Sequence, residues 1–359
     1  MAAPSTSYRP PASGAGRRAR RIPAGWAAAV LALALLAALT AAVSLGPVDL
    51  PPGEVWSVVA RRLTGRAPLP GTRDLIVWQL RVPRALLAAL VGAGLGLVGA
   101  AVQALVRNPL ADPYLLGISS GASLGAVAVI VLGTAGGALA GVGIGAAAFL
   151  GALGAFALVW AVARRGGGFA PLRLVLAGVG IGQFLAGFTS YLVLRAGDER
   201  QTRGVLFWLM GSLGGATWST LVVPAAAVPA ALAVLLARAR SLNALLMGDE
   251  TAAGVGVPVT RLRRELFVVT SMVTGVLVAV SGAIGFVGLM VPHVCRLLCG
   301  ADHRRLLPLS ALTGAVLLVV VDTVARTALD TQELPIGVVT ALIGAPALLY
   351  LLDRRLEHG

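Results

Sequence analysis

The sequence predicts an all-α polytopic membrane protein with about ten transmembrane helices and both termini in the cytoplasm. Two observations carry this prediction. First, 57% of the 359 residues are hydrophobic and only 12% are charged, whereas about a quarter of a typical soluble domain is charged. Second, apolar stretches close to the length that spans a bilayer recur along the chain. A soluble fold could not cover its surface with so few charges, so lipid is the expected solvent.

The chain divides into two tails and one transmembrane domain. Residues 1–23 are rich in Pro, Ser, Gly and Arg and are expected to form a disordered, basic cytoplasmic tail. The apolar stretch that follows is longer than the core of a signal peptide and is interpreted as a first span. The transmembrane domain covers 24–352, and 353–359 form a cytoplasmic C-terminal tail. The ten predicted spans are 24–46, 83–106, 113–133, 138–163, 174–194, 217–237, 266–283, 284–299, 306–326 and 336–352.

Arginine placement supports this topology. All 29 basic residues are arginine, and ten spans put most of them in cytoplasmic segments, as the positive-inside rule requires. They lie between apolar runs and form no stripe with aromatic residues, so nucleic acid is not an expected partner. The stretch 266–299 is interpreted as two helices with a sharp return, because one span would move Arg296, Arg304 and Arg305 outside. Four residues interrupt this stretch: Gly282, Gly285, Gly288 and Pro292.

Glycine spacing predicts close helix packing. Glycines four residues apart leave a smooth face on which another backbone can approach. The sets are Gly92 with Gly96, Gly117 with Gly121 and Gly125, and Gly178 with Gly182.

Little in the chain predicts catalysis or metal binding. The phosphate-binding loop GxxxxGK[ST] needs a lysine, and the chain has none. ATP-driven transport would therefore need a partner that hydrolyses the nucleotide. No cofactor or metal is expected on this chain, and Cys295 and Cys299 are interpreted as small apolar residues.

Two loops and one charged pair carry further information. In the turn 107–113, two prolines close one helix and open the next. The loop 238–265 is predicted to hold two short helices, the first with an apolar face and the second capped by Asp249; arginines flank both, so this loop is interpreted as a docking surface. Asp322 lies within a span, where a carboxylate is costly, and its i,i+4 spacing lets it pair with Arg326. That pair is either structural or functional. The apolar face consists of Leu242, Leu245, Leu246 and Met247.

At these motifs the sequence resembles the permeases of type II ABC importers for iron–siderophores, haem and cobalamin, the FecCD-type permease family. The resemblance covers about residues 75–352. Its matching stretches are LRVPR at 80–84, NPLADPYLLGISSGASLGA within 92–126, FWLMGSLGG at 207–215, the segment 246–258, GAIGFVGLMVPHVCRLLCGADHRRLLPLSALTGA at 282–315 and ELPIGVVTALIGAPALLYLL at 333–352.

The resemblance implies ten spans in the inner (cytoplasmic) cell membrane and a dimer with a second permease subunit. It also implies two ATPase subunits that use ATP and an extracytoplasmic substrate-binding protein. Its implied cargo is an iron–siderophore or a related chelate, haem or cobalamin. It also implies residue roles. The cytoplasmic gate would include Asn108, Leu110, Pro171 and Leu172, where Pro-Leu departs from the small polar residues of some relatives. ATPase coupling would use Gly248, Asp249, Glu250, Ala253, Gly254 and Gly256, and the binding protein would dock on Arg81, Arg84 and Arg326.

Two other classes compete with this interpretation. A secondary transporter driven by an ion gradient places ionisable groups near mid-membrane, and Asp322 is the strongest candidate for such a group. A structural membrane scaffold would not explain the two-helix loop 238–265. An adjacent gene for an ATPase with a lysine-containing phosphate loop would separate the importer from the gradient-driven transporter.

Overall fold

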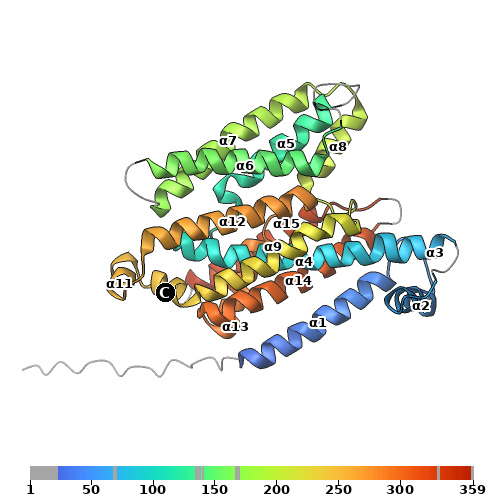
Figure 1. Ribbon diagram of the computed structural model, residues 1–359, viewed down its shortest axis with the longest axis horizontal. Coiled ribbons are helices and arrows are strands. Elements are labelled where there is room, and N and C mark those ends of the chain that lie inside the picture. Colours follow the sequence, from blue (N-terminus) through green and yellow to red (C-terminus); the bar gives the residue numbers. More distant parts are fainter. Residues whose placement is uncertain are drawn as a thin grey trace, which may run out of the picture.

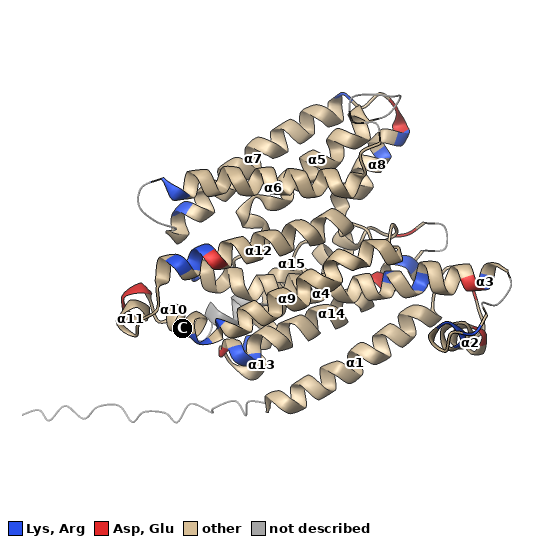
Figure 2. Ribbon diagram, viewed as in Figure 1, with Lys and Arg blue, Asp and Glu red and all other residues tan. Residues whose placement is uncertain are grey.

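The computed structural model describes residues 23–67, 71–133, 139, 141–165, 170–329 and 332–356. Within these residues the chain forms helices and connecting loops, without a strand. The long helices run side by side, and shorter helices lie at the two ends of the bundle (Figure 1). Arg, Asp and Glu gather toward these ends, leaving the middle of the bundle apolar (Figure 2).

Seven helices of the described chain are long and apolar enough to cross a membrane. Three shorter apolar helices accompany them, so the predicted all-helical, multi-pass class is confirmed. The long helices are α1 (Ala24–Ser44), the continuous helix Thr72–Leu105, α6 (Ile144–Arg164), α7 (Pro171–Leu194), α9 (Trp218–Ala237), α12 (Val259–Ser281) and α14 (His303–Thr327). The shorter ones are α5 (Ile118–Leu132), α13 (Val287–Cys299) and the part Ile336–Tyr350 of α15 (Ile336–Leu356).

The continuous helix Thr72–Leu105 is the centre of the bundle. It consists of α3 (Thr72–Asp74), the π-helical turn η1 (Leu75–Arg81) and α4 (Val82–Leu105). α4 packs against α14, α13, α12 and α9, and 78% of its most apolar stretch is buried inside the chain. Its glycines allow this closeness: a Cβ at Gly92 would lie 2.1 Å from the carbonyl oxygen of Gly314. The predicted glycine face of α4 is therefore a packing face.

A second layer, α5, α6 and α7, covers one side of this centre (Figure 1). α5 packs closely on α6, because a Cβ at Gly125 would lie 2.1 Å from the carbonyl oxygen of Ala147. Gly178 of α7 meets the 3₁₀ turn η2 (Pro113–Leu116) in the same way, at 2.2 Å from Leu115 O. The predicted small-residue contacts are thus confirmed on three helices.

Several helix boundaries differ from the sequence prediction. The central helix begins at Thr72, not at 83, and α5 begins at Ile118, after the turn η2 and the left-handed Gly117 (φ 74°). Two helices in the connections were not predicted: α2 (Pro52–Leu63) and α8 (Glu199–Met210). Both have too many charged residues for a membrane span, so a search for apolar stretches passes over them.

The stretch 266–299 does form two helices with a sharp return. α12 ends at Ser281, and Gly282 (φ 65°) and Phe286 (φ 66°) turn the chain before α13 begins at Val287. Gly288 and Pro292, predicted to belong to the break, lie inside α13 instead. A proline within a helix removes one backbone hydrogen bond but does not have to end it.

Candidate functional site

The loop 238–265 forms two short helices at one end of the bundle, α10 (Ala239–Leu246) and α11 (Asp249–Gly254), as predicted. α12 begins at Val259, so the last part of the predicted loop is helical. The apolar face of α10 divides in two. Leu242 and Leu245 are fully buried in the chain's own core, whereas Leu246 and Met247 are exposed. Only the second pair is free for a partner.

Asp249 does not cap α11, contrary to the sequence prediction. The N-cap is Gly248, whose φ of 109° only glycine adopts readily. Asp249 instead makes a bidentate ion pair with Arg263 of α12, at 2.6 and 2.8 Å. A carboxylate held by both guanidinium nitrogens fixes α11 against the start of α12.

The other residues matched to the coupling site lie on the outer surface of this end. Their side chains or backbones are open to solvent, and a Cβ at Gly254 would meet no atom within 4 Å. A partner subunit could therefore approach the α11 backbone closely. These exposed residues are Glu250, Ala253, Gly254 and Gly256.

The turn after α4 lies beside α11. Arg107 adopts a left-handed conformation (φ 53°), and its guanidinium lies 3.7 Å from the carboxylate of Asp249. The Asn108 side chain accepts a hydrogen bond from the Leu110 N–H (2.9 Å), which closes the turn. Because Asp249 contacts both Arg107 and Arg263, the structure joins the matched gate turn to the matched coupling helix.

Pro171 and Leu172 stand at the first turn of α7. Proline suits this position because its missing N–H would have no helical partner there. Leu172 is 70% exposed. Within the described residues, no hydrogen bond or ion pair joins this turn to Asn108 or Leu110, so the structure brings only the first half of the matched gate into contact with α11.

α7 presents an unusual outward face. Gly180, Gln183, Gly187 and Ser190 are all exposed and recur at three- to four-residue spacing, so they share one face of the helix. A Cβ at Gly180 or Gly187 would meet nothing within 4 Å. An amide on a lipid-facing surface in mid-span would be costly. Gln183 therefore fits a wet pathway or a contact with a second protein subunit better than it fits lipid.

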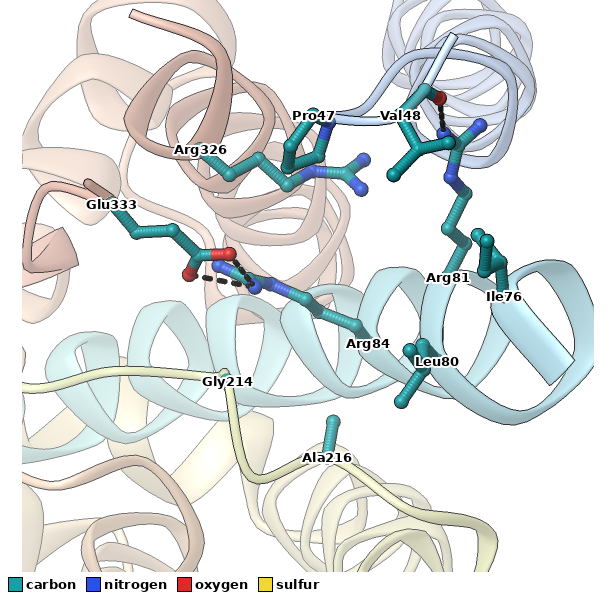
Figure 3. A pocket seen from close by; sticks show the side chains of 10 residues that line it. All are labelled: Pro47, Val48, Ile76, Leu80, Arg81, Arg84, Gly214, Ala216, Arg326 and Glu333. Carbon is teal, nitrogen blue, oxygen red and sulfur yellow. Dashed lines mark hydrogen bonds and ion pairs between the residues drawn. The ribbon is translucent and has the colours of Figure 1, made fainter. Parts of the chain in front are cut away.

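The opposite end of the bundle carries a cavity of about 400 Å³ lined by all three matched arginines, Arg81, Arg84 and Arg326 (Figure 3). Two of them are nearly inaccessible. Arg81 is 4% exposed and donates to the carbonyl oxygens of Val43 (3.2 Å), Ser44 (2.8 Å) and Val48, so it satisfies the C-terminal end of α1. Arg326 is also 4% exposed and donates to the carbonyl oxygen of Ala42.

Arg84 is the arginine that faces the cavity with a carboxylate already in place. Its Nε donates to both oxygens of Asp322, at 3.0 and 3.1 Å. Its Nη1 donates to both oxygens of Glu333, at 3.0 and 2.8 Å (Figure 3). Asp322 is almost fully buried, whereas the Glu333 side chain is 40% exposed. Glu333 is thus the accessible carboxylate of this cluster.

Sequence reasoning found only part of this charge cluster. The predicted Asp322–Arg326 pair is present but long, with 3.8 Å between Asp322 Oδ2 and Arg326 Nε. The closer partner of Asp322 is Arg84, which is 238 positions away. Helix periodicity predicts which side chains of one helix lie one turn apart. It carries no signal for a contact between two distant helices.

The described residues hold no cluster of three or more His, Cys, Asp or Glu side chains placed for a metal ion. Cys295 and Cys299 are buried free thiols. Cys295 donates to the hydroxyl of Thr313 (3.3 Å) and Cys299 to the Cys295 carbonyl oxygen (2.7 Å).

A bundle of this kind, whose long apolar helices are connected by charged ends, is that of a multi-pass membrane protein. Comparison with known proteins gives the family. The model of the FecCD transport family matches residues 33–354, and the chain belongs to this family.

Named relatives and a solved structure agree. The cobalamin import system permease protein BtuC of Halobacterium salinarum is 47% identical over 287 residues, covering 80% of this chain and 76% of that protein. The vitamin B12 import system permease protein BtuC of Salmonella typhimurium is 41% identical over 324 residues, covering 90% and 94%. A metal-chelate type ABC transporter, solved in an inward-facing conformation, superposes with a TM-score of 0.79 at 31% identity, covering 92% and 99%.

The chain is accordingly a permease subunit of an ABC importer and not an enzyme. The alternative of a gradient-driven transporter loses its candidate group as well. Asp322 is 1% exposed and is held by Arg84, so it does not lie in an open ion pathway.

Proposed function

We propose that this permease carries cobalamin, a cobalt chelate, across the cytoplasmic membrane into the cell. The observation that carries the proposal is the identity of 47% and 41% to two permeases named for cobalamin or vitamin B12 import. The resemblance alone implies an iron–siderophore or a related chelate, haem or cobalamin. Relatives this similar, over most of the chain, favour the corrinoid.

The proposed topology has ten spans with both termini in the cytoplasm. Seven long helices and three shorter apolar ones supply ten segments. α10, α11 and the C-terminal end of α15 lie at one end of the bundle, and α2, α3 and α8 lie at the other (Figure 1). This division separates the matched coupling residues from the matched docking arginines. The first end is the cytoplasmic one in this proposal.

The α7 face, defined by Gly180, Gln183, Gly187 and Ser190, lines the translocation pathway together with a second permease subunit. Its small residues leave space for a passing substrate, and its polar groups can be hydrated. The exposed face of α6 differs in both respects. On α6 the exposed Leu150, Gly154 and Leu158 form an apolar face that suits lipid. Whether the second subunit is the same chain or a paralogue, the pathway would lie between the two α7 helices.

The cytoplasmic gate would consist of the turn at Asn108 and Leu110 and the first turn of α7 at Pro171 and Leu172. Movement reaches it from α11. A push on the exposed α11 is transmitted through Asp249 to Arg107, which directly precedes Asn108. The bidentate Asp249–Arg263 pair makes α11 and the start of α12 move together.

Energy for this movement comes from two partner subunits that bind and hydrolyse ATP, since the sequence has no lysine for a phosphate loop of its own. No cofactor is needed on this chain. A substrate-binding protein outside the membrane would dock over the arginine cavity. Because Arg81 and Arg326 are held by backbone carbonyls, Arg84 is the arginine that can exchange partners, with a carboxylate of the binding protein replacing Glu333.

Uptake by the reconstituted complex tests the cargo. Proteoliposomes that contain the permease, its ATPase and its binding protein would be offered cobalamin, a ferric siderophore or haem, with ATP inside. We expect ATP-dependent accumulation of cobalamin alone. Accumulation of the siderophore or haem in preference to cobalamin would overturn the cargo and leave the importer class intact.

A substitution in α11 tests the coupling route. Gly254→Trp should leave folding unchanged, because the space around Gly254 is open. It should abolish ATP-driven uptake by preventing the ATPase from seating. Gly154→Trp, at an equally open position on α6, is the control and should transport normally. Normal uptake by the Gly254→Trp complex would place the coupling contact elsewhere.

A further inference from the structure

A second cavity, of about 490 Å³, lies between α1 and the helices α13 and α14. It is distinct from the arginine cavity, the gate turn and the α7 face. α1 packs along α14, but only Ala42 and Val43, at its C-terminal end, are fully buried. The N-terminal half of α1 lies at the edge of the bundle, with Trp26 and Val30 exposed (Figure 1). The cavity lies between this half of α1 and the helices α13 and α14, and we name it the α1 groove.

The lining of the α1 groove is apolar, and each helix contributes residues from one of its faces. α1 contributes Trp26 with Val30 and Ala27 with Leu31, each pair four residues apart. α13 contributes Cys295, Leu298 and Cys299, and α14 contributes Leu309 and Thr313. The only polar atoms among these side chains, apart from the Trp26 indole, are two thiols and one hydroxyl. Both thiols donate to groups of the chain itself. The groove therefore suits a hydrocarbon ligand.

Positive charge stands at one end of the groove. Arg305, Leu309 and Thr313 recur at i, i+4 and i+8, so Arg305 lies on the α14 face that lines the groove, one turn nearer the helix start. Arg304 and Arg305 are both exposed, and neither has an ion pair within the described residues. In the sequence, Arg21 and Arg20 come three and four residues before Ala24, the first residue of α1. Trp26, exposed at 72%, is the residue type that anchors at a membrane interface.

We propose that the α1 groove binds an anionic phospholipid of the cytoplasmic leaflet. An acyl chain occupies the groove between α1 and α13, and the phosphate pairs with Arg305 and Arg304. Basic sites between transmembrane helices on the cytoplasmic side are where such headgroups bind. The charge complementarity favours a lipid with a negative headgroup over a zwitterionic one, and over a second copy of this basic chain. The inference uses the proposed topology and is independent of the cargo.

Photo-cross-linking tests the site in the complete complex. The permease–ATPase complex would be placed in phosphatidylcholine nanodiscs that contain a small amount of a lipid with a diazirine on one acyl chain. In one sample this probe lipid is phosphatidylglycerol, and in the other it is phosphatidylcholine. We expect label on residues 26–31 of α1 and 295–299 of α13, stronger with phosphatidylglycerol. Val30→Trp, which fills the groove, should remove this label. Leu33→Trp, at an exposed α1 position that does not line the groove, should retain it.

The headgroup contact has its own variants. Arg305→Gln should lower the ratio of phosphatidylglycerol to phosphatidylcholine labelling about fivefold, as expected for one basic residue at an anionic surface. Arg240→Gln, an exposed arginine of α10 away from the groove, should leave the ratio unchanged. Label that survives Val30→Trp, equal labelling by both lipids, or a groove cross-linked to a second copy or to residues 1–22 would each overturn the proposal. Because labelling is read without transport, a wrong cargo would not affect the result.

Discussion

Two helices of this permease use glycine for opposite purposes. In α4, Gly92, Gly96 and Gly99 face the backbones of α13 and α14; a Cβ at Gly99 would lie 1.9 Å from the carbonyl oxygen of Gly288. In α7, Gly180 and Gly187 face open space. Both helices are apolar and rich in glycine, yet 78% of the most apolar stretch is buried in the helix that contains α4 and only 33% in α7.

The difference teaches how to interpret glycine in a membrane permease. Where a neighbouring backbone lies within contact distance, glycine is present because no other residue fits. Where nothing lies nearby, packing within the subunit does not require it. The glycines of α7 then point to something outside this chain, and the exposed Gln183 between them points to water or protein.

The largest effect is expected from Gly99→Leu in α4. The new side chain meets the backbone of α13, which no rotamer change can relieve, so the two helices must separate. We expect no monodisperse complex on size-exclusion chromatography. Gly154→Leu on the open face of α6 is the matched control and should elute as the parent protein does. Recovery of a stable Gly99→Leu complex would mean that α4 is not tightly enclosed.

A smaller but still large effect is expected from Asp322→Asn in the α4–α14 interface. The change leaves Arg84 and Arg326 near a neutral partner, and removing one member of a buried ion pair costs about 3–5 kcal/mol. The thermal unfolding midpoint of the purified complex should fall accordingly. Glu199→Gln breaks the exposed Glu199–Arg203 pair of α8 and should cost less than about 1 kcal/mol. Equal shifts for the two variants would contradict the buried character of the Arg84 cluster.

The sequence predicted what depends on neighbours along one helix. The apolar segments, the two short helices of the loop 238–265 and the glycine faces all follow from local spacing. Local spacing could not predict the ion pairs Arg84–Asp322 and Arg107–Asp249, because each pair joins separate helices or turns. The same limit explains why Arg81 and Arg84 could be matched to docking, but their bonds within the chain could not be predicted.

The two kinds of glycine also predict different effects on transport. Gly187→Trp in α7 should change stability by less than about 0.5 kcal/mol, as at other open surface positions. It should nonetheless block uptake, because the indole would project into the proposed pathway. Gly154→Trp on α6 should leave both properties unchanged. If the two tryptophans affect uptake equally, α7 faces lipid and the pathway lies elsewhere.

A smaller effect on stability than that of Asp322→Asn is expected at the start of α14, where Asn243 of α10 bonds the N-cap residue Asp302. Asp302, the N-cap residue, accepts hydrogen bonds from the Asn243 side chain (2.7 Å) and the Arg304 N–H (3.1 Å). The Asn243 hydrogen bond, followed by that of Arg304, lowers the pKa of the Asp302 carboxyl below its ordinary value. A lowered pKa adds stability above the ordinary value of about 3.9, and this stability is lost as pH falls through the lowered one.

Asn243→Ala should therefore reduce stability by about 1 kcal/mol at neutral pH. It should also move the acid-side fall of the unfolding midpoint to higher pH, because the Asp302 carboxyl would be protonated earlier. Asp302→Asn keeps a capping side chain but cannot titrate, so it should remove this part of the pH dependence. The measurement is the thermal unfolding midpoint of the purified complex across an acid pH series. Superimposable curves for Asn243→Ala and the parent protein would show that the α10 side chain does not stabilise the start of α14.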